Sequence, residues 1–449
     1  MRKPSGYLKV AALVMAGALL VAPTAGAKKK PKGPGDVTPV IFVHGGSGSA
    51  QQFESNAQRF TSNGYPHNRL FAYEYDTSTS GAEGIAAAVA GLDDFLAEVK
   101  DKTGFSQVDV AGHSRGTTVM HEFLSTPARA ANVRRYVNFD GRTSDSEPGG
   151  VPTLAVWGEG DQTREIVGAI NVYFPNKAHT EVTTSAEAFG EVYEFLNGEA
   201  PETTRVVPEP PGKVTVAGRA SVFPANIGNE GARVEIYRVS PANGARVSDT
   251  PRHAVTVGAD GSFGPFKVNG KKHYEFAVSR SGERTGHLYT EPFERDDRFV
   301  RLLTAPGLAP FIDSGPNHTI LAVSRMREWW GDQASPDDND RLELDGLNVL
   351  NPATAPRARR VIAVFALDRG SDGVTDTSTS LFPFNQLSFL TGVDVFMPAS
   401  SDASGSISVS ETVRGSGGHT ETINVPNWRS DQHTISVLFK DYIRSTFTP

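Results

Sequence analysis

The stretch DVAGHSRGTT (109–118) contains Gly112-His113-Ser114-Arg115-Gly116, a G-x-S-x-G pentapeptide. Such a match arises easily by chance in a chain with 45 glycines among 449 residues, so its neighbours must decide its meaning. QVDVAG (107–112) has the pattern of a strand, and a helix is expected from Arg115 to about Leu124. A serine at such a strand-to-helix turn, with glycine on either side, is typical of an exposed nucleophile. Ser114 is therefore the candidate nucleophile.

The sequence around this stretch, from 37 to 198, alternates short apolar runs with helical periods. Strands are predicted at 39–43, 69–75, 107–112, 133–139, 153–158 and 170–174, and helices at 81–102, 115–124 and 185–198. This alternation predicts an α/β fold with a mostly parallel sheet and helices on both of its faces.

The pattern changes after a Pro-rich, polar linker (199–212). Alternating strands with turn residues every 8–12 positions predict a β-sandwich domain over 213–305. Further strands over 306–449 predict a second β-rich domain, or an extension of the first. The pair Trp329-Trp330 is expected to pack in a core, and the acidic segment 335–346 to form an ordinary polar loop, because it lacks the EF-hand spacing.

The amino-terminal residues resemble an export signal. Arg2, Lys3 and Lys9 precede an apolar run (10–22) that is too short to span a bilayer comfortably. Ala25-Gly26-Ala27 is a typical cleavage site. The sequence therefore predicts a signal peptide (1–27), a basic flexible tail (28–36) and secretion, with no stable membrane span.

Composition excludes some classes of function. The net charge of −7 argues against nucleic-acid binding. The chain has no cysteine, which excludes disulfides, cysteine nucleophiles and cysteine metal sites.

A serine nucleophile needs a base, a group that orients the base, and donors for the oxyanion. The amide of Arg115 directly follows the nucleophile. The loop after the first strand, His44-Gly45-Gly46-Ser47, offers the second donor, for which we choose Gly46.

The acid and the base should follow later strands. Asp161, in the loop after the strand 153–158, is the preferred acid, with Asp140 in VNFDG as its rival. His179, in the loop before the final helix, is the candidate base. The order Ser114, Asp161, His179 is then nucleophile, acid, base, and this chemistry needs no cofactor.

The segments FVHGG (42–46), AGHSRG (111–116), GEGD (158–161) and AHTEV (178–182) make residues 37–198 resemble a compact α/β-hydrolase of the secreted bacterial lipase kind. YEFAV (274–278) and HLYTEPFERDDRFVRL (287–302) extend the likeness to bacterial and archaeal lipases whose β-rich C-terminal domain is implicated in long-chain substrates.

This resemblance implies ester hydrolysis through an acyl-enzyme, with acylglycerols as the expected substrates and the C-terminal β domains as a surface for lipid contact. A short-chain carboxylesterase or a polyester depolymerase is the alternative. A protein that binds surface lipid or glycan, with an incidental hydrolase domain, is the alternative of another class. The short connection between the strands 133–139 and 153–158 leaves no room there for a large lid.

Overall fold

The computed structural model describes residues 37–444. The predicted signal peptide (1–27) and basic tail (28–36) lie outside the described residues, as do the last five residues of the chain. Within the described part, no helix combines the length and the apolar character that a membrane crossing needs.

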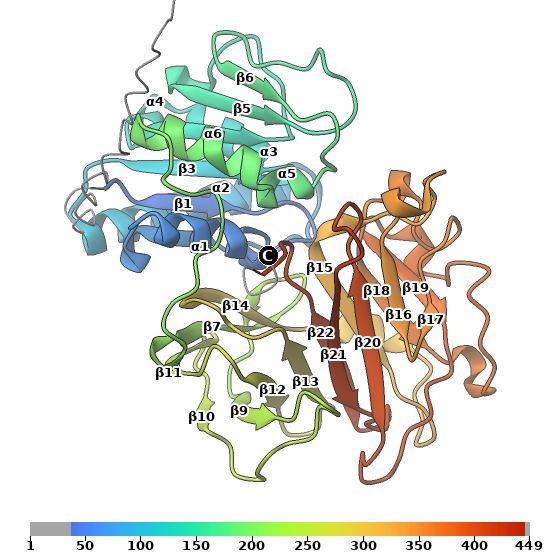
Figure 1. The fold of residues 1–449 in the computed structure, drawn as a ribbon. Coiled ribbons are helices and arrows are strands. Elements are labelled where there is room, and N and C mark those ends of the chain that lie inside the picture. Colours follow the sequence, from blue (N-terminus) through green and yellow to red (C-terminus); the bar gives the residue numbers. More distant parts are fainter. Residues whose placement is uncertain (1–36, 445–449) are drawn as a thin grey trace, which may run out of the picture. The chain divides into compact units, whose positions relative to one another are not determined.

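Residues 37–198 form a parallel sheet of six strands in the order β2-β1-β3-β4-β5-β6 (Figure 1). The strands are β1 (Val40–Val43), β2 (Leu70–Tyr73), β3 (Val108–His113), β4 (Val133–Phe139), β5 (Thr153–Trp157) and β6 (Ile170–Tyr173). The helices are α1 (Glu54–Ser62), α2 (Gly81–Thr103), α3 (Arg115–Leu124), α4 (Pro127–Ala130), α5 (Glu181–Thr184) and α6 (Ala186–Asn197). Every strand and helix predicted for this region is present, and α1, α4 and α5 are additional.

The sheet separates two apolar cores because alternate side chains of each strand point to opposite faces. Phe42 of β1 belongs to the core with α1 and α6. Its neighbour Ile41 belongs to the core with α2 and α3. Helices therefore cover both faces, which confirms the predicted α/β-hydrolase class of fold.

The remainder of the chain is β-rich, as predicted. Its strands are β7 (Thr215–Val222), β8 (Ile227–Gly228), β9 (Arg233–Val239), β10 (His253–Thr256), β11 (Ser262–Lys267), β12 (His273–Ser279), β13 (Thr285–Thr290), β14 (Asp297–Thr304), β15 (Leu321–Trp329), β16 (Arg341–Leu344), β17 (Leu347–Asn348), β18 (Val361–Leu367), β19 (Leu390–Asp394), β20 (Ser406–Thr412), β21 (Thr420–Pro426) and β22 (His433–Leu438).

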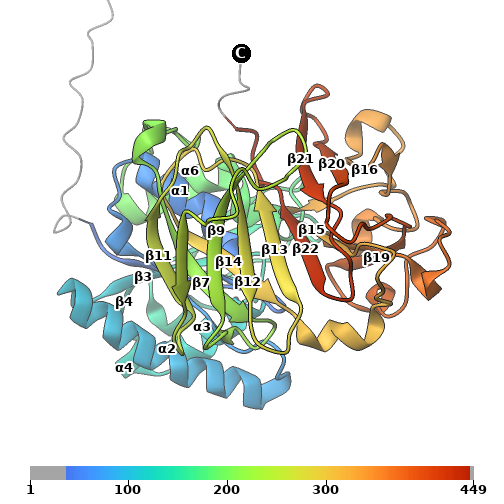
Figure 2. The ribbon, with the colours of Figure 1, turned by 90° about the horizontal axis from the view of Figure 1, so that it is seen from below.

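One sheet joins the two β domains that the sequence predicts. Its eight strands run β10-β9-β12-β13-β22-β15-β18-β19, so β13, from before residue 305, pairs in parallel with β22, from near the end of the chain (Figure 2). One half of this sheet shares a core with the sheet of β7, β11 and β14, and the other half with the sheet of β16, β20 and β21. Residues 306–444 thus share one sheet with the first β unit and contribute most of a second apolar core.

The linker 199–212 makes hydrogen bonds to both of its neighbouring regions. Asn63, at the end of α1, exchanges hydrogen bonds with Thr203, and Arg59 donates to the carbonyl of Thr204. The amide of Glu209 donates to the carbonyl of Glu294 in the β-rich region. The linker therefore connects α1 to the β-rich region through its backbone.

Candidate active site

Ser114 lies at the turn between β3 and α3, where the backbone is strained. Its φ and ψ angles are 52° and −119°, in a region that residues with a side chain rarely adopt. The turn is fixed by hydrogen bonds from the Ser114 amide to the Phe139 carbonyl (3.0 Å) and from Thr117 to the Ser114 carbonyl. Gly116 allows the close approach of β1, since a Cβ atom there would lie 2.4 Å from the Val43 carbonyl oxygen. This is the strained strand-to-helix turn that the pentapeptide predicts.

The segment 44–48, which we call the oxyanion loop, passes directly beside this turn. A Cβ atom on Gly45 would lie 3.2 Å from the Cβ of Ser114, and one on Gly46 would lie 3.6 Å from Arg115. Gly45 donates its amide to the side chain of Gln52. Among residues 37–444, no acceptor engages the amides of Gly46 or Arg115, so both can donate to a ligand beside Ser114.

His179 is held by Asp140. The imidazole Nδ1 lies 2.6 Å from the Asp140 Oδ2, and both side chains are buried. The other carboxylate oxygen accepts the Gly158 amide at 2.9 Å and lies 3.0 Å from a guanidinium nitrogen of Arg164. Burial alone would raise the pKa of the Asp140 carboxyl, but His179, the Gly158 amide and Arg164 outweigh it and hold the pKa below its ordinary value. Asp140 is thus an ionised group that orients His179.

Asp161 does not contact His179, so the choice of Asp161 as the acid is wrong in this structure. Its side chain is exposed and accepts hydrogen bonds from the amide and the hydroxyl of Thr163, which closes a local turn. Asp140 directly follows β4, the strand that pairs with β3 and Ser114. That β4 lies next to β3 is given by the strand order of the sheet, which the sequence pattern alone does not supply.

His113, inside the pentapeptide, connects the serine turn to the oxyanion loop and to His179. Its Nε2 donates to the His179 carbonyl (2.9 Å), and its Nδ1 accepts from the amide group of Gln52, whose oxygen accepts the Gly45 amide. Burial lowers the pKa of His113 well below its ordinary value, with the neighbouring His179 adding to the effect. His113 therefore stays neutral and bridges the oxyanion loop to His179.

The β-rich region also holds the oxyanion loop in place. Arg301 of β14 lies 2.5 Å from the carboxylate of Glu74, which accepts the Ala50 amide and lies 3.3 Å from His44. The side-chain amide of Asn226 donates to the carbonyls of Gly48 (2.9 Å) and Tyr75 (3.0 Å).

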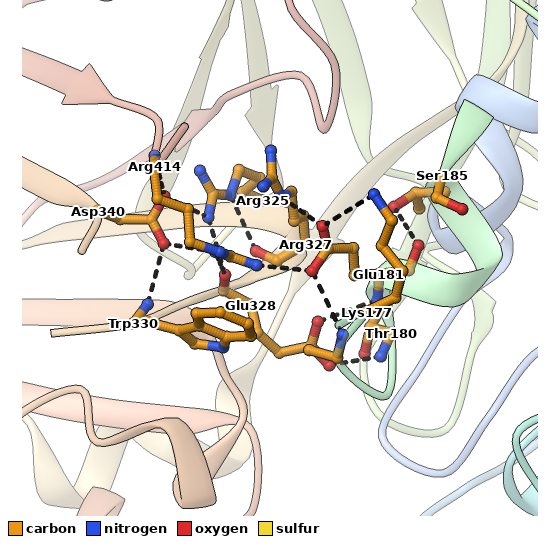
Figure 3. Close-up of polar contacts among 12 residues, drawn as sticks. Lys177, Thr180, Glu181, Ser185, Arg325, Arg327, Glu328, Trp330, Asp340 and Arg414 are labelled. Atoms are coloured by element: carbon orange, nitrogen blue, oxygen red, sulfur yellow. Dashed lines mark hydrogen bonds and ion pairs between the residues drawn. The ribbon is translucent and has the colours of Figure 1, made fainter. Parts of the chain in front are cut away.

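A second set of contacts holds residues 177–185, which we call the histidine loop. The carboxylate of Glu328, at the end of β15, accepts the backbone amides of Thr180 and Glu181 (Figure 3). The Glu181 carboxylate in turn lies 2.6 Å from Arg414 and 3.1 Å from Arg327. These contacts come from the part of the chain beyond residue 306, far from His179 in sequence.

Phe389, just before β19, stacks on the imidazole of His179, with the ring centroids 5.9 Å apart and the planes 14° apart. Its φ of 70° places it in the left-handed region, which is strained for a large side chain. Phe382 and Leu387 in the same segment are exposed, 60% and 39% respectively. Sequence reasoning missed this apolar segment, because nothing in its local pattern connects it to His179.

Three family models match the chain in succession. The lipase (class 2) model matches residues 37–126, the lipase C-terminal domain model matches 212–306, and a further C-terminal domain model matches 307–443. With the parallel sheet and the β-rich region, these matches identify the chain as a lipase-like α/β-hydrolase with a C-terminal β domain. The first model includes Gly46 and Ser114 and ends before Asp140 and His179.

Several solved structures are similar to part of the chain. A protein of Listeria innocua is 14% identical over 38% of this chain and 97% of its own, with a TM-score of 0.29. Aspergillus fumigatus lipase B is 14% identical over 38% of this chain and 56% of its own, with a TM-score of 0.31. A carboxylesterase of Bacillus subtilis is 14% identical over 37% and 86%, with a TM-score of 0.27. No curated protein is detectably similar to the chain.

Proposed function

We propose that the protein is a secreted lipase that hydrolyses the carboxylic esters of acylglycerols, with Ser114 as nucleophile, His179 as base and Asp140 as the orienting acid. The observation that carries this proposal is the 2.6 Å contact between His179 Nδ1 and Asp140 Oδ2. Asp140 directly follows Phe139, whose carbonyl accepts the amide of the strained Ser114. A base oriented by a buried carboxylate is the requirement for activating a serine hydroxyl.

The proposed reaction has two halves. His179 Nε2 takes the hydroxyl proton as Ser114 Oγ attacks the ester carbon, and the oxyanion accepts hydrogen bonds from the amides of Gly46 and Arg115. The intermediate collapses, and His179 gives its proton to the departing alcohol. Water then attacks the acyl-enzyme with His179 as base, which releases the fatty acid and restores Ser114.

Two observations support an apolar acyl chain as the substrate group. The matched lipase models cover residues 37–126 of the hydrolase part and residues 212–306 of the adjoining β unit. Phe389 stacks on His179, and the same segment of the chain carries the exposed apolar side chains Phe382 and Leu387. An acyl chain bound there would be removed from water, which favours binding by about 0.8 kcal/mol for each buried methylene.

A short-chain carboxylesterase is the second candidate function. The connection from β4 to β5 holds a three-residue 3-10 helix, Pro148–Gly150, as its regular structure, which supports an open site. A polyester depolymerase would use the same open site. Hydrolysis rates measured on a series of esters from acetate to emulsified triolein, and on a polyester film, separate these substrates.

The experiment that tests the proposed chemistry is Ser114→Ala. We expect kcat on any accepted ester to fall by about 10⁴-fold or more, with an unchanged thermal unfolding midpoint. Retained turnover in a folded variant would contradict the mechanism. Strong binding to lipid vesicles or glycan by a wild-type protein that hydrolyses no ester would instead support the surface-binding alternative. Secretion is tested by sequencing the mature amino terminus from the culture medium, where we expect Lys28.

A further inference from the structure

Glu328 lies where β15 departs from regular pairing. Its register with β18 shifts between Ser324 and Trp329, so the intervening residues form an irregular, bulged stretch. The fully buried Arg325 stabilises this stretch by donating hydrogen bonds to the carbonyls of Arg327 and Glu328. A bulge changes the direction in which a side chain leaves the strand. Here the Glu328 carboxylate points toward the histidine loop.

The Glu328 carboxylate uses both oxygens on the two residues that follow His179. One oxygen accepts the Thr180 amide and the other accepts the Glu181 amide at 3.0 Å. Two amide donors match an ionised carboxylate, because a protonated one would have to turn a hydroxyl toward an N–H group. Glu328 therefore binds two consecutive backbone amides of the histidine loop, those of Thr180 and Glu181, as Figure 3 shows.

The same loop is fixed at His179 by two further contacts. Asp140 accepts from the imidazole, and His113 donates to the His179 carbonyl. Asp140 and His113 belong to the hydrolase sheet, whereas Glu328 belongs to the β-rich region. The position of the imidazole therefore depends on both parts of the chain.

Charges around this carboxylate come from several elements. His179 attracts it, while the Glu181 carboxylate repels it. Arg325 and Arg414 donate to the backbone carbonyl of Glu328, and they are neutralised mainly by Asp340, Glu411 and Glu181. The charge of Glu328 therefore remains available to the imidazolium that forms on His179 during the proposed reaction.

We propose that Glu328 is a positioning residue for His179: by binding the amides of Thr180 and Glu181 it fixes the imidazole, and its charge favours the imidazolium. This inference rests on the proposed function. Its consequence is that the region beyond residue 306 serves catalysis on every ester, short soluble ones included, in addition to any contact with long acyl chains.

The test compares an isosteric variant, Glu328→Gln, with a shorter one that keeps the charge, Glu328→Asp, on p-nitrophenyl acetate, a short soluble ester. For Glu328→Gln we expect kcat to fall roughly 10- to 100-fold with KM nearly unchanged, because a small displacement of a catalytic group has an effect of this size. We also expect the acidic limb of the plot of kcat/KM against pH to move to lower pH, since the lost charge no longer favours the imidazolium. Glu328→Asp keeps the charge, so its acidic limb should stay near that of the wild type while kcat falls.

Glu291→Gln is the matched control. Glu291 is also buried and accepts a backbone amide, from Lys440, but it pairs with Arg444 and is not part of the histidine loop contacts. We expect its kcat and acidic limb to match the wild type. A folded Glu328→Gln protein with the wild-type kcat and pH profile would overturn the inference, as would an equal change in Glu291→Gln. Either result leaves the proposed function standing, because that function is tested separately by the Ser114→Ala variant.

Discussion

The oxyanion loop and the histidine loop are each held by a buried carboxylate, but the two carboxylates have different partners. Glu74 behind the oxyanion loop is neutralised by the guanidinium of Arg301 and lies beside His44. Glu328 behind the histidine loop is bound by two backbone amides, without a cation at its carboxylate among the described contacts. The charge of Glu74 is balanced by Arg301, so this carboxylate serves only to hold the oxyanion loop. The charge of Glu328 is not balanced in this way, so in our proposal it can stabilise the imidazolium that forms on His179.

The pKa directions express the same difference. Burial would raise the pKa of Glu74, but Arg301 and His44 outweigh it and lower the pKa. For Glu328 burial prevails over the Thr180 amide and His179, and the pKa is raised. The hydrolase sheet therefore supplies the strained serine turn. The β-rich region supplies Arg301, which pairs with Glu74 behind the oxyanion loop, and Glu328, which binds the histidine loop.

The largest expected effect concerns the acid of the site. Asp140→Asn should lower kcat by about 10⁴-fold, because an amide cannot hold the imidazole in the required tautomer. Asp161→Asn is the control, and its kcat should stay within about twofold of the wild type, since Asp161 is exposed and serves a local turn. The reverse ranking of the two variants in steady-state ester hydrolysis would restore Asp161 as the acid.

The next effect concerns the buried pair of Arg301 and Glu74. Arg301→Met leaves the buried Glu74 carboxylate without its guanidinium partner, so the free energy of unfolding should fall by about 3–5 kcal/mol. Arg429→Met removes a guanidinium from an exposed pair with Asp431 and should change it by no more than about 1 kcal/mol. Urea titrations measure both free energies of unfolding. Similar decreases in the two variants would show that the buried pair contributes no more to stability than the exposed one.

The smallest effect is the pH dependence of stability. The lowered pKa of Glu74 stabilises the fold above the ordinary value of 4.5, and this contribution is lost as the pH falls through the folded-state pKa. The raised pKa of Glu328 has the opposite sign, so its contribution is lost as the pH rises above 4.5 through the folded-state pKa.

Urea unfolding at several pH values separates the two carboxylates. The stability of the wild type relative to Glu74→Gln should decrease on acidification, and relative to Glu328→Gln it should decrease on raising the pH. Parallel curves for the three proteins would refute the assigned pKa directions.

Much of the fold could be predicted because the parallel strands are short apolar runs bounded by turns. Helix α1 was missed for the opposite reason: its sequence, ESNAQRFTS, is polar, yet Glu54 through Thr61 are all buried. Their partners come from distant segments, as when Lys440 pairs with Glu54 and the Thr184 carbonyl accepts from Arg59. Periodicity cannot reveal a helix whose polar face is covered by another part of the chain.

The site shows the same limit. Local strand and helix order led to the choice of Ser114 and His179: Ser114 lies between β3 and α3, and His179 lies just before α5 and α6. Asp140 and Asp161 follow adjacent strands, so local pattern could not choose between them without the side-chain contact to His179. Glu328 and Phe389 reach the histidine loop across more than 140 residues, and that pairing arises only from tertiary structure.

The central claim is that Ser114 is a nucleophile activated by His179 and Asp140. The most direct measurement is covalent labelling of the wild-type protein with a fluorophosphonate, followed by peptide mass spectrometry and repeated with Asp140→Asn. We expect one adduct, on Ser114, that forms rapidly in the wild type and far more slowly in Asp140→Asn. An adduct on another residue, or an equal labelling rate in the two proteins, would contradict it.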